Sequence, residues 1–174
     1  DMLVFLPGER WIRDAERELK HSGPKAYDIL PLYARLTATR QHRIFAPGAA
    51  PRIVLATNIA ETSLTVPRIR FVIDSGLARV SRYSTRHRLQ ALGVEPIAKA
   101  NAVQRAGRCG RLAPGICVRL YEEQDFEARP DFMEPEILRT NLAGVILKLE
   151  SLRLGGIDEF PFIDPPPTKA VNDA

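Results

Sequence analysis

The stretch PRIVLAT, residues 51–57, and the stretch IRFVIDSG, residues 69–76, decide the fold. Both are short, apolar and rich in β-branched side chains, and MLVFLP (2–7), YDILPLYA (27–34) and GICVRLY (115–121) have the same character. Strands covered on both faces consist of such near-continuous apolar runs, whereas strands with one wet face alternate apolar and polar residues. These runs therefore predict a parallel sheet buried between helices.

Helix-like segments separate the strand-like runs. GERWIRDAERELKHSG (8–23) has apolar residues at helical spacing, and its Gly23 suits a helix end. TATRQHRIF (37–45) begins with a threonine that can cap a helix, and NAVQRAGRCGR (101–111) also has helical character. Strands alternating with amphipathic helices predict an α/β fold with a doubly wound, mostly parallel sheet.

Two later segments break this alternation. ARVSRYSTRHRLQALGVEP (78–96) consists of two extended basic runs around a turn, which predicts a protruding β-hairpin. PEILRTNLAGVILKLESLRLG (135–155) has the apolar side of one long amphipathic helix. We expect one domain over residues 1–130, with the hairpin at about 78–96, and the start of a second domain over residues 131–174, cut before it can close a core.

Charge is concentrated in the middle of the chain. The 174 residues carry a net charge of +4, yet Arg68–Arg111 contains nine Arg and one Lys against Asp74 and Glu95. Such a cationic block favours a polyanionic partner, either nucleic acid or a nucleotide phosphate. The alternative is a solvated, arginine-rich surface.

Apolar runs and cysteine spacing bear on where in the cell the protein is located. No apolar run approaches the roughly 18 residues that cross a bilayer, and no stretch resembles a signal peptide. Cys109 and Cys117 have neither a zinc-site nor a disulfide spacing, which favours a reducing, cytoplasmic location. Because the chain opens on Asp1 and leads straight into a strand-like run, we expect it to be a piece of a longer protein.

The stretch QRAGRCGR, residues 104–111, has the residues for chemistry on phosphates. On a helix, Gln104, Arg108 and Arg111 would share one face, with Gly107 and Gly110 removing bulk beside them. Two guanidinium groups can neutralise a γ-phosphate while an amide orients water, as phosphoryl transfer requires. A solvated basic helix is the alternative, but it needs neither the glycines nor the shared face.

Four motifs in order resemble those of superfamily 2 helicases of the DEAH-box type. QRAGRCGR resembles motif VI, and ATNIAETSLTVPRIRFVIDSGLAR (56–79) resembles motif V with the strand that follows it. LVFLPGERWI (3–12) is similar to motif IV, and LYARLTATRQHRIF (32–45) to the segment between motifs IV and V. The combination looks most like the bacterial HrpA-like branch.

This resemblance implies a second RecA-like domain, followed by the start of a winged-helix domain. The sequence has neither a P-loop nor a DEAH tetrad, so ATP and Mg²⁺ would be bound mainly by a first RecA-like domain. The implied catalytic residues are Gln104, which positions the attacking water, and the arginine fingers Arg108 and Arg111. The implied ATP-binding residues are Phe45, Ser63 and Gly107, with the Phe45 ring stacking on the base.

The resemblance also implies an RNA-binding set: Thr57, Asn58, Thr65, Arg82, Arg86 and Arg88. Thr57 and Asn58 would grip the backbone, Ser63 and Thr65 would link nucleotide state to the RNA track, and the hairpin arginines would contact phosphates. For Thr57 and Asn58 a plain helix cap is the alternative. Pro67 departs from the family pattern, in which an aspartate usually reaches the ribose, so no such contact is expected.

We therefore expect half of the motor of an ATP-dependent RNA helicase that translocates 3'-5' on single-stranded RNA. Its partners would be single-stranded RNA or an RNA duplex with an overhang, with DNA as a further candidate, and the first RecA-like domain of the same chain. We expect a cytoplasmic monomer with no membrane contact, no metal ligands of its own and no ATPase activity as an isolated fragment. The alternative function is a nonenzymatic nucleic-acid-binding module.

Overall fold

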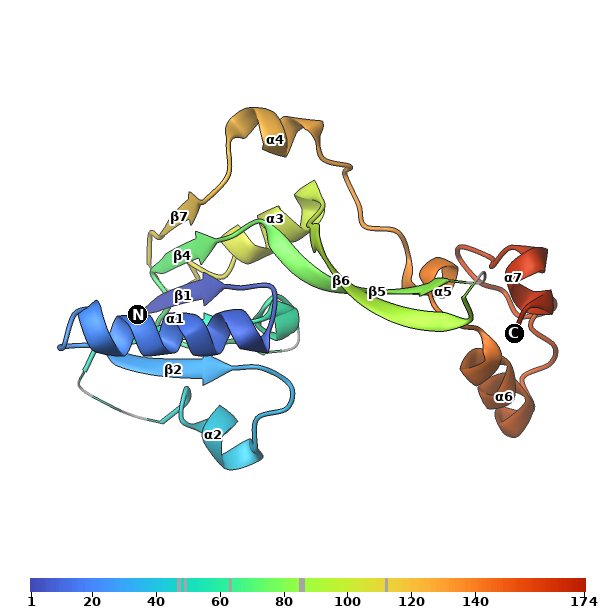
Figure 1. Cartoon of the computed structure of the whole chain (residues 1–174), viewed down its shortest axis with the longest axis horizontal. Helices are drawn as coiled ribbons and strands as arrows, with labels where there is room; N and C mark the ends of the chain where they lie inside the picture. The colour runs from blue at the N-terminus through green and yellow to red at the C-terminus, as the bar shows by residue number, and fades with distance from the viewer. Residues whose placement is uncertain (47, 49, 63, 85–86, 112) are drawn as a thin grey trace. The chain divides into compact units, whose positions relative to one another are not determined.

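The computed structural model describes residues 1–174 except 47, 49, 63, 85–86 and 112 (Figure 1). The chain divides into two compact units. The first unit comprises Asp1–Arg79 and Val94–Met133, and the second comprises Val80–Gly93 and Glu134–Ala174. Each unit is described by itself.

A five-stranded parallel sheet forms the centre of the first unit, with strand order β2-β3-β1-β4-β7. Its strands are β1 (Met2–Phe5), β2 (Asp28–Leu32), β3 (Arg52–Ala56), β4 (Phe71–Asp74) and β7 (Ile116–Arg119). All five residues of β3 are buried, as expected for a central strand covered on both faces. The parallel sheet predicted from the apolar runs is confirmed.

Both faces of the sheet are covered. Helix α1 (Glu9–Ser22) packs Ile12 against Ile53 and Leu55 on one face. On the other face, Leu3, Phe5 and Val54 pack against residues that follow α2 (Ala38–His42) and against η1 (Asn58–Ala60). This arrangement is the predicted doubly wound α/β fold.

Helix α3 (Lys99–Ala106) is shorter than the sequence predicts. The expected helix extended to Arg111, but Gly107 forms the C-cap and Gly110 has a φ of 82°. That left-handed conformation cannot continue a right-handed helix and favours glycine. Arg108 and Arg111 therefore lie in the turn after α3 and not on the helix itself. Helix α4 (Glu123–Ala128) follows β7.

The predicted hairpin is present as β5 (Leu77–Ser84) and β6 (Leu89–Pro96), which form a separate two-stranded antiparallel sheet. Its base belongs to the first unit and its outer part, Val80–Gly93, to the second.

The second unit contains α5 (Glu136–Arg139), α6 (Ala143–Leu152) and α7 (Thr168–Asn172) around Leu142, Leu149 and Ile157. The single helix predicted over 135–155 is therefore wrong. Asn141 Oδ1 accepts a hydrogen bond from the Ala143 amide at 2.9 Å, a local turn that competes with the helical hydrogen bonds. The assignment of residues 131–174 to the start of a winged-helix domain stays a prediction. Of the helices described, none has the length and apolar character needed to cross a membrane.

Candidate functional site

The segment after β3 and the turn after α3 lie against each other, and together they hold most of the predicted site residues. Arg108 donates to the carbonyl oxygens of Glu61 and Leu64, the latter at 3.3 Å. Arg111 Nη1 donates to Thr65 Oγ1 at 3.0 Å. The fold thus brings the QRAGRCGR segment into contact with Glu61, Leu64 and Thr65, although the contacting residues are 44 to 47 positions apart in the sequence.

A buried ion-pair network anchors this contact. Arg105 is fully buried, and its Nε donates to Glu61 Oε2 at 3.0 Å while Nη1 donates to Asp74 Oδ1 at 2.7 Å. The guanidinium carbon also lies 4.8 Å from the centroid of the Phe5 ring. A buried charge is tolerated only when it is paired and hydrogen-bonded, and here one cation bridges two carboxylates. Arg105 therefore ties α3 to β4 and to the segment after β3.

The carboxylates of Glu61 and Asp74 accept further hydrogen bonds. Asn101 Nδ2 donates to Glu61 Oε1 at 2.5 Å, and the Gly76 amide donates to Asp74 Oδ1 at 2.9 Å. The Tyr121 hydroxyl donates to Asp74 Oδ2 at 3.1 Å. Burial, together with the Asp74 charge, raises the pKa of Tyr121 to about 12, so this hydroxyl stays protonated as a donor at neutral pH.

Arg108 is half-buried beside a second cation. Burial and the positive charge of Arg111 lower the pKa of Arg108, while the charge of Glu61 opposes that shift. Within the described part of the chain, the buried Nε of Arg108 has no hydrogen-bond partner. Two neighbouring guanidinium groups repel each other, and an anion placed between them would relieve that repulsion.

Gln104 and Arg111 are both exposed. Gln104 lies on the last turn of α3, whereas Arg111 lies beyond it, where its Nε also donates to the Gly107 carbonyl at 3.4 Å. The single helical stripe that the sequence predicts is not formed, because the helix ends at Ala106. What brings Arg108 and Arg111 together is their shared contact with residues 61–65.

The structure requires glycine at position 110 but not at position 107. Gly110 needs its left-handed conformation, at a φ of 82°. Gly107 has a φ of −65°, and a Cβ built there would lie 3.4 Å from the Gln104 carbonyl oxygen, an ordinary contact. The backbone and its neighbours therefore do not require glycine at position 107.

Thr57 and Asn58 lie where β3 ends. The Thr57 hydroxyl accepts a hydrogen bond from the Ile59 amide at 3.5 Å and so caps η1. This is the helix cap that the sequence analysis gave as the alternative to an RNA-binding role. The Asn58 side chain is exposed. Ligands of parallel α/β sheets usually bind at this carboxyl edge, so the cap does not conflict with a binding role.

Phe45 follows α2 and has 41% of its surface exposed. Its ring centroid lies 6.1 Å from that of His42, edge-on. The neighbouring Ile44 is buried, and Arg52 fixes the turn by donating to the Ile44 carbonyl at 2.7 Å. A partly exposed ring on a fixed turn can stack on a flat ligand.

The hairpin arginines belong to the second unit. Arg82 Nη1 donates to Glu134 Oε2 at 2.7 Å. The Arg88 side chain is exposed, and its backbone has a positive φ of 49°. Two further predicted residues, Ser63 and Arg86, lie outside the described residues.

Sequence reasoning missed the network around Arg105, since it assigned no role to that arginine. One signal was present: Asp74 ends an apolar strand-like run, and an acidic residue in such a place needs a buried cation. In the described residues, no group of three or more His, Cys, Asp and Glu side chains could hold a metal ion.

Comparisons with known proteins identify the family. The helicase conserved C-terminal domain family matches residues 1–113. The chain is 56% identical over 173 residues to the ATP-dependent RNA helicase HrpA homolog of Haemophilus influenzae. It is 55% identical over 173 residues to the ATP-dependent RNA helicase HrpA of Escherichia coli. Each alignment covers 99% of this chain and 13% of the relative, so the chain spans only that small part of their length.

Solved structures agree. The crystal structure of Escherichia coli DEAH/RHA helicase HrpB matches with a TM-score of 0.90 and 36% identity. That of E. coli DExH-box NTPase HrpB matches with a TM-score of 0.87 and 35% identity. Each match covers 99% of this chain and 22% of the solved chain. The chain therefore belongs to the helicase conserved C-terminal domain family, in its HrpA-like DEAH-box branch.

Proposed function

We propose that this chain is the second RecA-like half of an ATP-dependent RNA helicase motor, continued by the start of a winged-helix domain. The observation that carries the proposal is the pair of neighbouring guanidinium groups of Arg108 and Arg111 on one loop, residues 61–65. Relatives named ATP-dependent RNA helicases support the substrate class.

On the nucleotide side, Arg108 and Arg111 act as arginine fingers on the γ-phosphate, and Gln104 orients the attacking water. Phe45 stacks on the base, and Ser63 and Gly107 complete the ATP contacts. Mg²⁺, when bound, neutralises phosphate charge. This chain's described residues offer cations and amides at the site and not a carboxylate cluster, which fits phosphate contacts here and metal ligands on a first RecA-like domain.

The contacts of the two arginines suggest how hydrolysis is coupled to RNA. Arg111 bonds Thr65 in the present state, so turning toward a γ-phosphate would release Thr65 and the loop that follows Thr57. A ligand shifts a conformational equilibrium only through such differential contacts. ATP binding and hydrolysis would thereby change the grip of Thr57, Asn58 and Thr65 on the RNA backbone.

On the RNA side, this changing grip moves the motor 3'-5' along a single strand, while Arg82, Arg86 and Arg88 of the hairpin contact phosphates near a duplex. Phosphate contacts are independent of sequence and weaken with salt. We infer a cytoplasmic, monomeric enzyme whose partners are RNA, single-stranded or with a duplex, and the first RecA-like domain of the same polypeptide.

The test replaces one finger in the complete polypeptide that carries this chain. We expect Arg111→Ala to lower RNA-stimulated ATP hydrolysis by about 10³-fold or more, because an arginine finger contributes 10³–10⁵ to the rate. Binding of single-stranded RNA without ATP should persist. Arg17→Ala, on the exposed surface of α1, is the matched control and should leave both activities unchanged.

Wild-type turnover by Arg111→Ala would remove the finger assignment. A nonenzymatic binding module predicts a different pattern, in which wild type hydrolyses no ATP and Arg108→Ala lowers RNA affinity. The isolated chain should show no ATPase activity in the same assay.

A further inference from the structure

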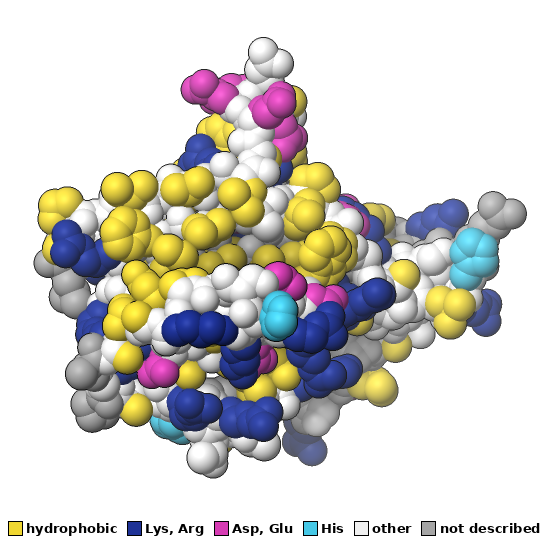
Figure 2. All heavy atoms as spheres, turned by 60° about the vertical axis from the view of Figure 1, so that its left-hand side comes forward, with side chains coloured by type: hydrophobic (Ala, Val, Ile, Leu, Met, Phe, Trp, Pro, Cys, Tyr) yellow, Lys and Arg dark blue, Asp and Glu magenta, His cyan; other side chains and the backbone are white. Residues whose placement is uncertain are grey.

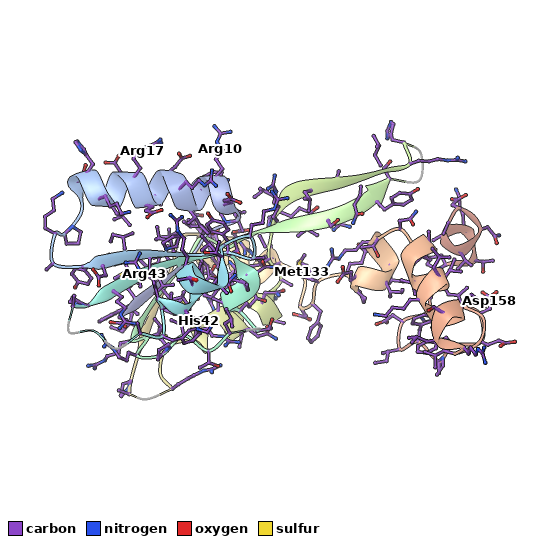
Figure 3. All side chains as sticks on the ribbon, turned by 90° about the horizontal axis from the view of Figure 1, so that it is seen from below. Arg10, Arg17, His42, Arg43, Met133 and Asp158 are labelled. Atoms are coloured by element: carbon purple, nitrogen blue, oxygen red, sulfur yellow. The ribbon has the colours of Figure 1, made fainter. Side chains whose placement is uncertain are left out.

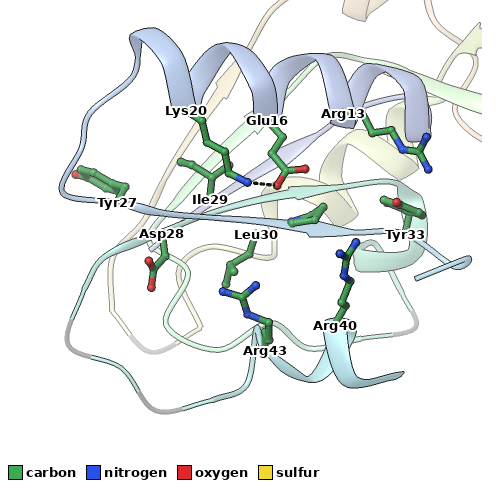
Figure 4. A pocket seen from close by; sticks show the side chains of 11 residues that line it. Arg13, Glu16, Lys20, Tyr27, Asp28, Ile29, Leu30, Tyr33, Arg40 and Arg43 are labelled. Carbon is green, nitrogen blue, oxygen red and sulfur yellow. Dashed lines mark hydrogen bonds and ion pairs between the residues drawn. The ribbon is translucent and has the colours of Figure 1, made fainter. Parts of the chain in front are cut away.

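A basic cleft lies at the outer edge of the sheet in the first unit, around the edge strand β2. It has a volume of about 600 Å³, within the range of small-ligand sites. Figure 4 shows its two walls: Arg13, Glu16 and Lys20 reach from α1, and Arg40 and Arg43 reach from the segment of α2. Of the predicted site residues that the structure describes, none lines it.

The α1 wall has its charges largely paired. Lys20 Nζ donates to Glu16 Oε1 at 2.6 Å, and Arg13 pairs with Glu9. A hydrogen bond to Tyr33 and the charge of Glu9 raise the pKa of Arg13. These pairs hold the basic side chains of α1 at the cleft but leave little net charge on that wall.

The opposite wall is different. In the part of the chain that the structure describes, the side chains of Arg40 and Arg43 take part in no hydrogen bond or ion pair. Both are exposed, and three residues apart on one helical turn they present their guanidinium groups to the same side (Figure 4). Two carboxylates line the cleft, those of Glu16 and Asp28. Glu16 is paired with Lys20, whereas no basic side chain among the described residues pairs with Asp28. Figure 2 shows Lys and Arg side chains gathered on the lower half of one face, with acidic ones among them.

The edge strand disfavours a peptide as the occupant. The Asp28 amide donates to Pro51 and the Leu32 carbonyl accepts from Thr57, so the backbone amide and carbonyl groups of the even-numbered residues of β2 point towards β3. The backbone groups of Ile29 and Pro31 therefore point to the free edge of the sheet, and Pro31 has no amide hydrogen to donate there. A proline on an exposed edge blocks regular pairing with an added strand.

Tyr27 offers an additional contact of a different kind. Its ring lines the cleft and has 38% of its surface exposed. Tyr27 lies at the Asp28 end of the cleft and Arg40 towards the other end (Figure 4). A cleft lined by both an aromatic ring and unpaired guanidinium groups suits single-stranded nucleic acid, since bases stack on the ring while the phosphates meet the cations.

We propose that this edge cleft binds the phosphate backbone of single-stranded RNA as a second contact, separate from the grip at Thr57 and Asn58. Arg40 and Arg43 neutralise phosphates, Lys20 exchanges its ion pair with Glu16 for a further phosphate, and Tyr27 stacks on a base. The inference rests on the RNA binding of the proposed function and not on its ATPase activity.

The experiment measures the salt dependence of binding of a long single-stranded oligouridylate to the complete polypeptide without ATP. Each phosphate contact on a single strand contributes about 0.7 to the slope of log K against log salt. Arg40→Gln with Arg43→Gln should therefore lower the slope by about 1.4, and Lys20→Gln, on the other wall, by about 0.7. The matched control is Arg10→Gln with Arg17→Gln, which removes two charges from the outer side of α1 (Figure 3). It should leave the slope unchanged.

Three results would overturn the proposal. The slope could remain that of wild type in both cleft variants, or the control could lower it equally, which would show a general effect of net charge. The cleft variants could also retain RNA binding but lose affinity for polyglutamate, which would make the cleft a docking site for acidic protein segments. RNA-stimulated ATPase of the wild type, measured on the same preparation, tests the proposed function separately: wild-type activity together with any of these three results would exclude the cleft alone.

Discussion

At the scale of single residues, Arg105 decides whether the site can be assembled. Among the described residues it is the largest fully buried side chain, and it joins Glu61, from the segment after β3, to Asp74, at the end of β4. Arg108, three residues later, reaches the same segment from the turn after α3. Buried Arg105 thus joins the two segments between which half-buried Arg108 donates its hydrogen bonds.

Removing this cation should be costly. Arg105→Ala leaves two carboxylates buried without their partner, and breaking a buried pair typically costs about 3–5 kcal/mol. We expect that loss in the free energy of unfolding of the chain, measured with urea. Arg17→Ala, which removes an exposed ion pair with Asp14, should cost less than about 1 kcal/mol. Equal losses of stability in Arg105→Ala and Arg17→Ala would contradict a special role for Arg105. Adding Asp74→Asn to Arg105→Ala removes one of the unpaired carboxylates and should restore part of the stability; no recovery in this double variant would also contradict the role.

At the scale of elements, the end of α3 sets the direction of the two proposed fingers. The sequence predicts the strands well, because an apolar run of four or five residues is local information. The end of α3 has a local signal that the expected helix ignored, since Gly107 is the C-cap and Gly110 has a left-handed φ. The sequence does not predict that Arg108 then bonds backbone carbonyls more than forty residues away, because such long-range contacts leave no periodic pattern. The break between α5 and α6 was missed for a related reason: the apolar spacing continues through Asn141 while its side chain forms a turn.

The two glycines after α3 provide a matched pair of substitutions. Gly110→Ala forces a side chain into the left-handed region and should destabilise the chain by about 1–2 kcal/mol. Gly107→Ala meets only ordinary contacts at an allowed φ and should change stability by less than about 1 kcal/mol, in the stabilising direction. Thermal unfolding of both variants checks the expectation. Loss of stability in Gly107→Ala alone would show that the turn is held differently.

At the scale of the whole molecule, the fold and the family follow from local patterns, whereas the site depends on which segments meet. Residues 57–65 and 104–111 could be singled out by resemblance and by residue chemistry, and the structure brings Arg108, Arg111 and Thr65 together. The Arg105 network and the edge cleft could not be found in this way, since their members come from separate elements with no shared motif.

The measurement that bears most directly on the central claim is single-turnover hydrolysis of ATP by the complete polypeptide with saturating RNA. Arg108→Lys and Arg111→Lys keep the positive charge but lose the planar fork that matches phosphate oxygens. If these two groups neutralise the γ-phosphate in the transition state, each variant should hydrolyse bound ATP at least about 100-fold more slowly, a loss below that of complete finger removal, while still binding ATP. Hydrolysis of bound ATP at the wild-type rate in both variants would contradict the account.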